Sequence, residues 1–220
     1  MRVVSRCLTL SFALALGSFS LPANTVTFDD LPSLTDMSTV SPYGGLNWTN
    51  YTSYKDSGTN SVTYDGYANG VVSQPGAVFS GGEIAGDTVV EISGSFSSST
   101  PFTLNAAYLG AAHRNGEEVV VNGFNGSNLV FSQTLTLFTS GAQQYSFEEA
   151  GLTSVVITPV AGTGVDTYGC GSFNCTQFTM DNLEINDPIP TNAPEPASLL
   201  LGGLAFGVLG LLRGRLARGN

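Results

Sequence analysis

The central part of this chain shows no sustained apolar period of 3.6 residues, which an amphipathic helix requires. Short runs rich in β-branched and aromatic residues recur instead, separated by Gly, Asn, Ser and Pro. The dipeptides Asn115-Gly116 and Asn125-Gly126 are typical of tight turns between antiparallel strands. The pattern therefore predicts an all-β antiparallel sandwich, with no helix beyond a single turn beginning at Glu148-Glu149.

This predicted sandwich is a single domain over 24–187, long enough to bury a core without disulfide support. Its strands are expected at 25–29, 46–51, 70–73, 77–80, 88–96, 102–112, 117–124, 129–138, 143–147, 153–159 and 177–185.

The N-terminal segment has the order of a secretory signal peptide. Two arginines precede an apolar stretch, 7–16, that is too short to span a bilayer, and small residues follow it. We therefore expect 1–23 to be removed on export, with cleavage after either Ala23 or Ser20. The alternative is a buried N-terminal helix.

Charge is distributed unevenly along the chain, whose formal net charge is -10. Between 24 and 193 only two basic side chains, Lys55 and Arg114, stand against sixteen acidic ones. A surface of that sign repels phosphate backbones, so we expect no nucleic-acid partner. Divalent cations and neutral ligands such as sugars are compatible with it.

The C-terminal end combines a Pro-rich linker, an apolar run and a basic tail. Pro194-Glu195-Pro196 closes the linker 188–196, and the apolar run 197–212 follows it. A helix of that length would measure roughly 24 Å, short for a bilayer core of about 30 Å but within what snorkelling or local thinning accommodates. The arginines of the tail, 213–220, would keep this end on the cytoplasmic side.

This order, Pro194-Glu195-Pro196 followed by a short apolar helix and a basic tail, resembles the PEP-CTERM sorting signal of Gram-negative bacteria. The resemblance covers 194–220. It implies transient anchoring in the inner membrane, with the export machinery and an exosortase as partners, and cleavage near the motif in bacteria that also make exopolysaccharide. The alternative is a permanent C-terminal anchor, which predicts the same topology before processing.

Three segments of the central domain carry a second resemblance. TVTFDDL at its start, YGGLNWTNY soon after and CTQFTMDNLEIN at its end resemble the strands of galactose-binding-like jelly-roll domains, which occur in secreted bacterial proteins and carbohydrate-binding modules. In several such modules an acid after the first strand and an aspartate of the last strand hold a structural Ca²⁺ together with backbone carbonyls.

The second resemblance implies a calcium site at Asp29 and Asp181, with Asp30 and Asn182 as adjacent oxygen donors. Hard oxygen ligands are those that Ca²⁺ prefers. The alternative is structural, with Asp29 and Asp30 capping a turn and Asp181 interrupting an edge strand.

Two cysteines, Cys170 and Cys175, remain once Cys7 leaves with the signal peptide. Both lie in a Gly- and Asn-rich loop, and in an oxidising compartment this spacing predicts a disulfide between them. Two thiolates alone make an incomplete metal site, and the single histidine, His113, lies far away in the sequence.

No catalytic constellation stands out. His113 lies where a strand enters a hairpin, so we interpret it as a solvated loop histidine rather than a general base. A glycosidase with paired carboxylates remains an alternative because several glutamates are available. The adjacent Glu117 and Glu118 point to opposite faces of a strand, and we interpret them as solubilising charge.

Aromatic residues concentrate in the first third of the domain. Trp48 lies in an alternating strand and is interpreted as core, whereas the surrounding tyrosines are expected at the surface. Sugars pack on aromatic rings while amides and carboxylates bind their hydroxyls. The tyrosines assigned to this binding face are Tyr54, Tyr64 and Tyr67.

The sequence therefore predicts an exported, non-catalytic protein of the extracellular matrix or cell envelope that binds exopolysaccharide or another carbohydrate. Two alternatives remain: a secreted carbohydrate-active enzyme that uses paired glutamates, and a self-associating structural surface protein.

Overall fold

The computed structural model describes residues 23–55, 66–81, 83–85, 88–90, 92–167 and 175–188, and gives only the backbone for 83–85 and 88–90. The predictions for the signal peptide, Tyr64, Cys170, the sorting motif and the run 197–212 lie outside these residues and stay predictions. Within the part that is described, no helix is long and apolar enough to cross a membrane.

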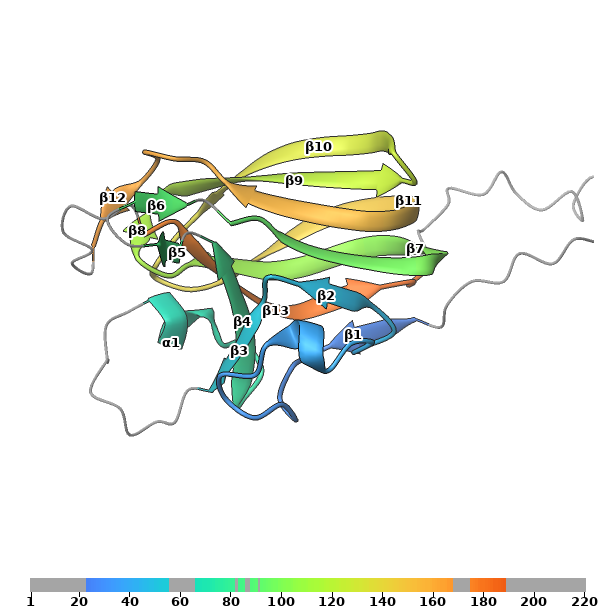
Figure 1. Ribbon diagram of the computed structural model, residues 1–220, viewed down its shortest axis with the longest axis horizontal. Helices are drawn as coiled ribbons and strands as arrows, with labels where there is room; N and C mark the ends of the chain where they lie inside the picture. Colours follow the sequence, from blue (N-terminus) through green and yellow to red (C-terminus); the bar gives the residue numbers. More distant parts are fainter. Residues whose placement is uncertain are drawn as a thin grey trace, which may run out of the picture. The chain divides into compact units, whose positions relative to one another are not determined.

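Antiparallel strand is the main regular structure of the described chain, as predicted (Figure 1). Helical structure is confined to one 3-10 turn, η1 (Met37–Thr39), and one short helix, α1 (Gly66–Gly70). The strands are β1 (Asn24–Val26), β2 (Asn47–Thr49), β3 (Thr52–Lys55), β4 (Gly76–Gly81), β5 (Glu83–Ala85), β6 (Thr88–Val90), β7 (Gly94–Ala111), β8 (Arg114–Asn115), β9 (Glu117–Asn125), β10 (Asn128–Leu137), β11 (Gln143–Pro159), β12 (Val165–Asp166) and β13 (Gln177–Ile185).

Nine strands form one sheet in which neighbours run β10-β9-β11-β7-β13-β4-β3, with β1 added to β13 and β2 added to β7. The sheet folds into two layers, and its two longest strands, β7 and β11, run through both of them. The beginning of β7 pairs with β2 and the end of β11, whereas its remainder pairs with β13 and the beginning of β11. The sheet therefore folds over a single core, with β9, β10 and β11 above β7, β13 and β1 in Figure 1.

Alternation along the strands builds this core. In β9 burial alternates residue by residue, and Val119 and Val121 are fully buried. Trp48 of β2 is 2% exposed, which confirms its assignment to the core. Its ring centroid lies 5.4 Å from that of Phe28 and 5.2 Å from that of Phe96. Aromatic rings of this size each remove roughly 150–250 Å² from water, so this group carries much of the apolar burial.

Strand β11 corrects two sequence predictions. It is continuous where two strands were expected, and the helical turn predicted at Glu148-Glu149 is wrong because both residues lie in this strand. Glu148 has a φ of 53°, and the register against β7 shifts between Ser146 and Glu149. A β-bulge bends a strand without ending it. The acidic pair therefore lies at a bend within one strand and not at a break between two strands.

Two further differences lie around α1. The strand predicted at 70–73 is instead the last residue of α1 and the loop that follows it, and no strand was predicted over the residues of β3. The backbone N–H of Gly66 donates to the carbonyl of Ala112 at 2.9 Å. A Cβ on Gly66 would lie 1.8 Å from the carbonyl oxygen of Ala111, so only glycine permits this close approach of α1 to the sheet.

Candidate functional site

Asp181 of β13 is fully buried and fastens the loop before β4. Its Oδ2 accepts hydrogen bonds from the backbone N–H groups of Val72 and Ser73, each at 2.7 Å. Its Oδ1 accepts from the backbone N–H of Asn182 at 2.7 Å. Burial raises the pKa of Asp181 from 3.8 to about 6, while the hydrogen bonds from Ser73, Val72 and Asn182 act in the opposite direction.

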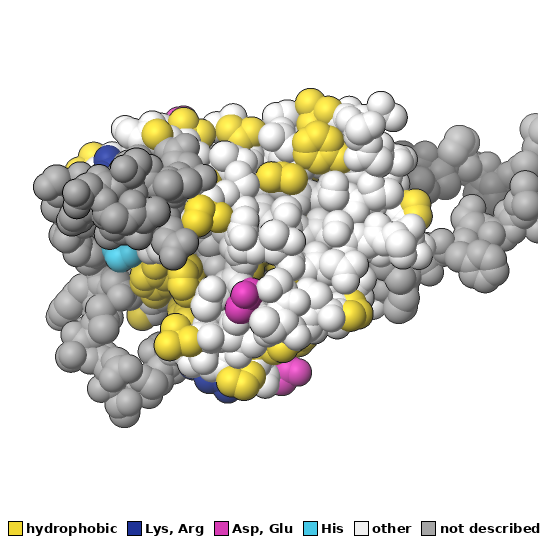
Figure 2. Space-filling model, in the orientation of Figure 1, with side chains coloured by type: hydrophobic (Ala, Val, Ile, Leu, Met, Phe, Trp, Pro, Cys, Tyr) yellow, Lys and Arg dark blue, Asp and Glu magenta, His cyan; other side chains and the backbone are white. Residues whose placement is uncertain are grey.

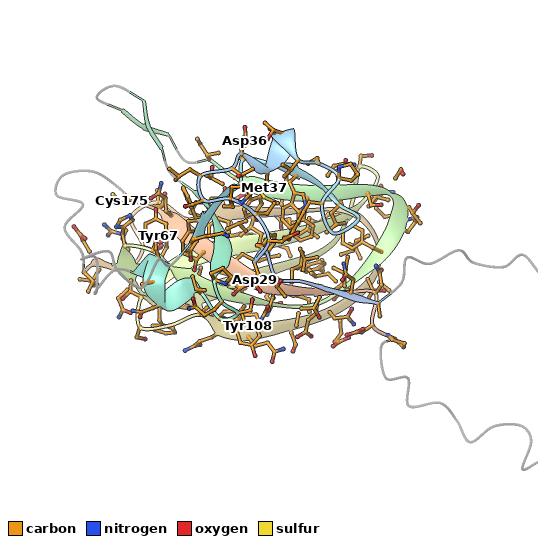
Figure 3. All side chains as sticks on the ribbon, turned by 90° about the horizontal axis from the view of Figure 1, so that it is seen from below. Asp29, Asp36, Met37, Tyr67, Tyr108 and Cys175 are labelled. Carbon is orange, nitrogen blue, oxygen red and sulfur yellow. The ribbon has the colours of Figure 1, made fainter. Side chains whose placement is uncertain are left out.

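Asp29, which follows the first strand β1, lies beside Asp181 of the last strand, β13. Its Oδ1 lies 3.4 Å from the hydroxyl of Ser73, which in turn lies 3.2 and 3.3 Å from the two carboxylate oxygens of Asp181. The same hydroxyl lies 3.5 Å from the carbonyl oxygen of Thr27. The structure therefore brings Asp29 and Asp181 together around Ser73, because β1 pairs with β13. Asp29 is labelled in Figure 3.

Asp30 is placed apart from this cluster. It is exposed, and its Oδ1 accepts a hydrogen bond from the hydroxyl of Tyr43 at 2.5 Å. Burial, followed by this hydrogen bond to Asp30, raises the pKa of Tyr43 above its usual range. Among the residues described, no group of three or more His, Cys, Asp or Glu side chains is gathered as a metal centre.

The oxygen cluster fits a hard cation by ligand type, since it offers two carboxylates, one hydroxyl and the Thr27 carbonyl. A carboxylate has about four acceptor positions. Three of those on Asp181 are taken by backbone N–H groups, and the hydroxyl of Ser73 faces the remainder. To bind a cation here, the Ser73 hydroxyl would have to turn a lone pair toward the ion and its proton away from the two aspartates.

Tyr54 and Tyr67, two of the predicted sugar-binding residues, do lie together. Their ring centroids are 5.4 Å apart, and that of Phe79 lies 5.3 Å from that of Tyr67. The hydroxyl of Tyr54 donates to the Tyr67 carbonyl at 2.8 Å, and the hydroxyl of Tyr67 donates to Oε1 of Gln177. Both tyrosines are half-buried, so they present part of each ring rather than free hydroxyls.

His113 belongs to the same aromatic cluster, which we define as Tyr54, Tyr67, Phe79 and His113. Its ring lies edge-on to Tyr67 with centroids 5.3 Å apart, and Figure 2 shows hydrophobic side chains beside the single histidine. His113 lies in the bend between β7 and β8, as expected, but it is half-buried against Tyr67 rather than fully solvated.

A groove of about 520 Å³ adjoins this cluster, within the usual size range of ligand pockets. Phe79 belongs to both the cluster and the lining of the groove, and Gln177 of the lining accepts a hydrogen bond from the hydroxyl of Tyr67. The described lining mixes aromatic rings with hydroxyl, amide and carboxylate groups. It consists of Asp36, Ser38, Thr49, Asn50, Tyr51, Thr52, Phe79, Ser80, Gly81, Ile92 and Gln177.

The sequence reasoning missed most of this groove. Tyr51 was expected at the surface, but it is 1% exposed and lies edge-on between Trp48 and Phe178. One local signal was available: Asp36 caps η1 through a 2.9 Å hydrogen bond from the backbone N–H of Ser38, a typical Asp-x-Ser turn. Nothing in the sequence indicates that η1 lies beside the distant Gln177.

The glutamates are placed differently from one another. Glu117 and Glu118 take opposite faces of β9, as predicted, but Glu117 is fully buried, so its assignment as solubilising charge is wrong. Glu148 is exposed and accepts from the side-chain amide of Asn105 at 3.0 Å. Asp36 is the one carboxylate in the described lining of the groove.

No protein-family model matches the chain, and no curated protein matches it. Among solved structures, the chain is similar to the K2 cleaved adhesin domain of Lys-gingipain, with 13% identity over 76% of this chain and 100% of that chain and a TM-score of 0.43.

Proposed function

We propose that this chain is an exported, non-catalytic protein whose β domain associates with carbohydrate, in particular matrix exopolysaccharide. The observation that supports it most directly is the continuity of the aromatic cluster with the polar groove through Phe79 and Gln177. Ring faces pack against the C–H surfaces of sugars, while amide and hydroxyl groups bind sugar hydroxyls. On this proposal the domain is a jelly roll of the galactose-binding-like kind.

A pull-down on neutral and acidic matrix polysaccharides tests this function. We expect the protein to be retained on at least one polysaccharide, and retention to fall in Tyr54→Ala and Tyr67→Ala. Tyr145→Ala is a matched control, because Tyr145 lies in β11 and is absent from the described lining of the groove. Absence of retention on every polysaccharide would contradict the proposal.

Export and sorting form a separate part of the proposal. Pro194-Glu195-Pro196, the apolar run and the basic tail act as a PEP-CTERM signal that an exosortase cleaves after export, and Cys170 and Cys175 form a disulfide in the oxidising compartment. The test is the mass of the secreted protein in a host with and without exosortase. A Pro194→Ala/Glu195→Ala/Pro196→Ala variant should keep its C-terminal segment, and equal processing of this variant would contradict the assignment.

The oxygen cluster at Asp29, Ser73 and Asp181 supports a proposed structural Ca²⁺. Those residues would supply carboxylate and hydroxyl oxygens, with Thr27 adding its carbonyl. Isothermal titration with CaCl₂ should show binding that both Asp29→Asn and Asp181→Asn weaken. Unchanged binding in the two variants would remove the site.

A further inference from the structure

Two side chains that line the groove, Tyr51 and Ser80, carry buried hydroxyl groups with no hydrogen-bond partner among the described residues. Tyr51 and Ser80 both line the groove and are only 1% and 4% exposed. Neither the Tyr51 Oη nor the Ser80 Oγ makes a hydrogen bond within the described part of the chain. Buried polar side chains are rarely left in this condition, because removing a hydroxyl from water without replacing its hydrogen bonds costs about 1–3 kcal/mol.

The two groups lie close to one point, the backbone of Gly94 at the start of β7. A Cβ built on Gly94 would lie 2.5 Å from Cζ of Tyr51, the atom that carries its hydroxyl, and 2.8 Å from Oγ of Ser80. Glycine therefore leaves room for both, and any side chain at this position would collide with them. The pair comes from separate parts of the chain, since Tyr51 precedes β3 and Ser80 belongs to β4.

Tyr51 is fixed in place by its neighbours. Its ring lies edge-on to Trp48 and to Phe178, with centroid separations of 5.4 and 6.1 Å. Ser80 is held by the ladder in which β4 pairs with β13. Groups fixed in this way lose little conformational entropy when they bind a ligand, which is the arrangement expected of a preorganised anchor.

The surrounding chemistry selects the charge of the ligand. Burial raises the pKa of the Tyr51 hydroxyl above its usual range, so this group stays neutral. The exposed carboxylate of Asp36 at the rim disfavours an anion. A hydroxyl both donates and accepts, so one ligand hydroxyl could satisfy Tyr51 and Ser80 together.

We infer that Tyr51 and Ser80 form a hydroxyl-binding subsite at the base of the groove, which takes one hydroxyl of an uncharged polyhydroxylated ligand such as a sugar residue. The inference rests on the proposed association with carbohydrate and makes it specific, because it assigns the orienting contact to these two side chains. Asn50 stands at the rim, where its side-chain amide donates to the Ser93 carbonyl at 3.1 Å.

Tyr51→Phe and Ser80→Ala test the subsite by a combination of binding and stability. The probes are the methyl glycosides of glucose, galactose and mannose and neutral oligosaccharides of the same sugars, titrated by saturation-transfer NMR. Each variant should lose about tenfold in affinity or more, the effect of one hydrogen bond of about 1.4 kcal/mol. The urea midpoint of each variant should equal or exceed that of the parent protein, because neither substitution removes a hydrogen bond that the described residues make.

Tyr145→Phe is the matched control. The Tyr145 hydroxyl donates to the carbonyl of Thr136 at 2.5 Å, so its loss should lower the urea midpoint and leave sugar binding unchanged. Tyr51→Phe should therefore lower sugar binding without lowering stability, whereas Tyr145→Phe should lower stability without lowering sugar binding. A merely structural role for Tyr51 would not produce this contrast.

The outcomes separate the subsite from the wider function. If the parent protein binds a sugar and Tyr51→Phe and Ser80→Ala bind it equally well, the subsite is wrong and the association with carbohydrate stands. If no probe binds the parent protein and no polysaccharide retains it, both fall. If Tyr51→Phe is destabilised as much as Tyr145→Phe, the hydroxyl has a partner within the protein and the subsite is overturned regardless of binding.

Discussion

Asp181 holds Ser73 through two different donors of the same residue. The backbone N–H of Ser73 lies 2.7 Å from Oδ2 of Asp181, and the Ser73 hydroxyl lies 3.2 Å from Oδ1. Asp181 belongs to β13, whereas Ser73 lies in the loop between α1 and β4. One buried carboxylate thus joins a loop without regular structure to a central strand.

Asp181→Asn should destabilise the fold by about 3 kcal/mol. The asparagine amide has one acceptor oxygen where the carboxylate has two, so it leaves buried N–H donors unpaired. Equilibrium unfolding in urea measures the loss. Asp30→Asn is the control, since Asp30 is an exposed acid near the same end of the domain and should change stability by less than about 1 kcal/mol. Equal losses in the two variants would contradict the role of Asp181.

The same carboxylate should make stability depend on pH. Because its pKa is raised from 3.8 to about 6, the folded state binds the proton more tightly than the unfolded state. In EDTA, the contribution of Asp181 to the free energy of unfolding should therefore increase as pH falls through 6 and be complete near 3.8. The difference between the parent protein and Asp181→Asn across that window isolates this term, and a flat difference would refute it.

Calcium should act in the opposite direction along the pH axis. A cation requires the ionised carboxylate, so millimolar Ca²⁺ should raise the melting temperature more at pH 7.5 than at pH 5, which bracket the pKa of about 6. Mg²⁺ should have a smaller effect, because it gives up its water ligands reluctantly. A Ca²⁺ shift that survives in Asp29→Asn/Asp181→Asn would place the ion elsewhere.

Trp48 provides a test of the core. Trp48→Ala should lower the free energy of unfolding by about 3–5 kcal/mol, because it removes the contacts with Phe28 and Phe96 and the 2.9 Å hydrogen bond from Nε1 to the Tyr43 carbonyl. Val165→Ala, at a side chain that is 71% exposed, should cost less than about 0.5 kcal/mol. Unfolding in urea should be followed by circular dichroism in both variants. Trp48 is the one tryptophan of the chain, so its replacement leaves no tryptophan fluorescence to follow.

The sequence was informative where a local pattern matched a local structure. Local patterns predicted the strand at β9 and the buried position of Trp48, and the resemblance to galactose-binding-like domains implied that Asp29 and Asp181 meet. The pairing of β1 with β13 provides the physical reason, since it joins the two ends of the domain.

Features set by tertiary packing were not accessible in the same way. The groove combines Asp36, Tyr51, Ser80 and Gln177, which only the sheet topology brings together. The acidic pair Glu148-Glu149 predicted a break between two strands, but the strand continues through a bulge at Glu148, whose φ of 53° no local sequence pattern indicates.

The pairing of Asn24 with Ile185 places the first rung of β1 against the last rung of β13. A pull applied to both ends of the domain would open this ladder one rung at a time, from the outside inward, with little resistance. A pull at the C-terminal end loads Ile185 first, which pairs with Asn24 of β1 on one side and with Leu104 of β7 on the other. The pairing of β13 with β4 begins only at Met180. The β1–β13 ladder is therefore the place where tension on the ends of the domain first separates strands.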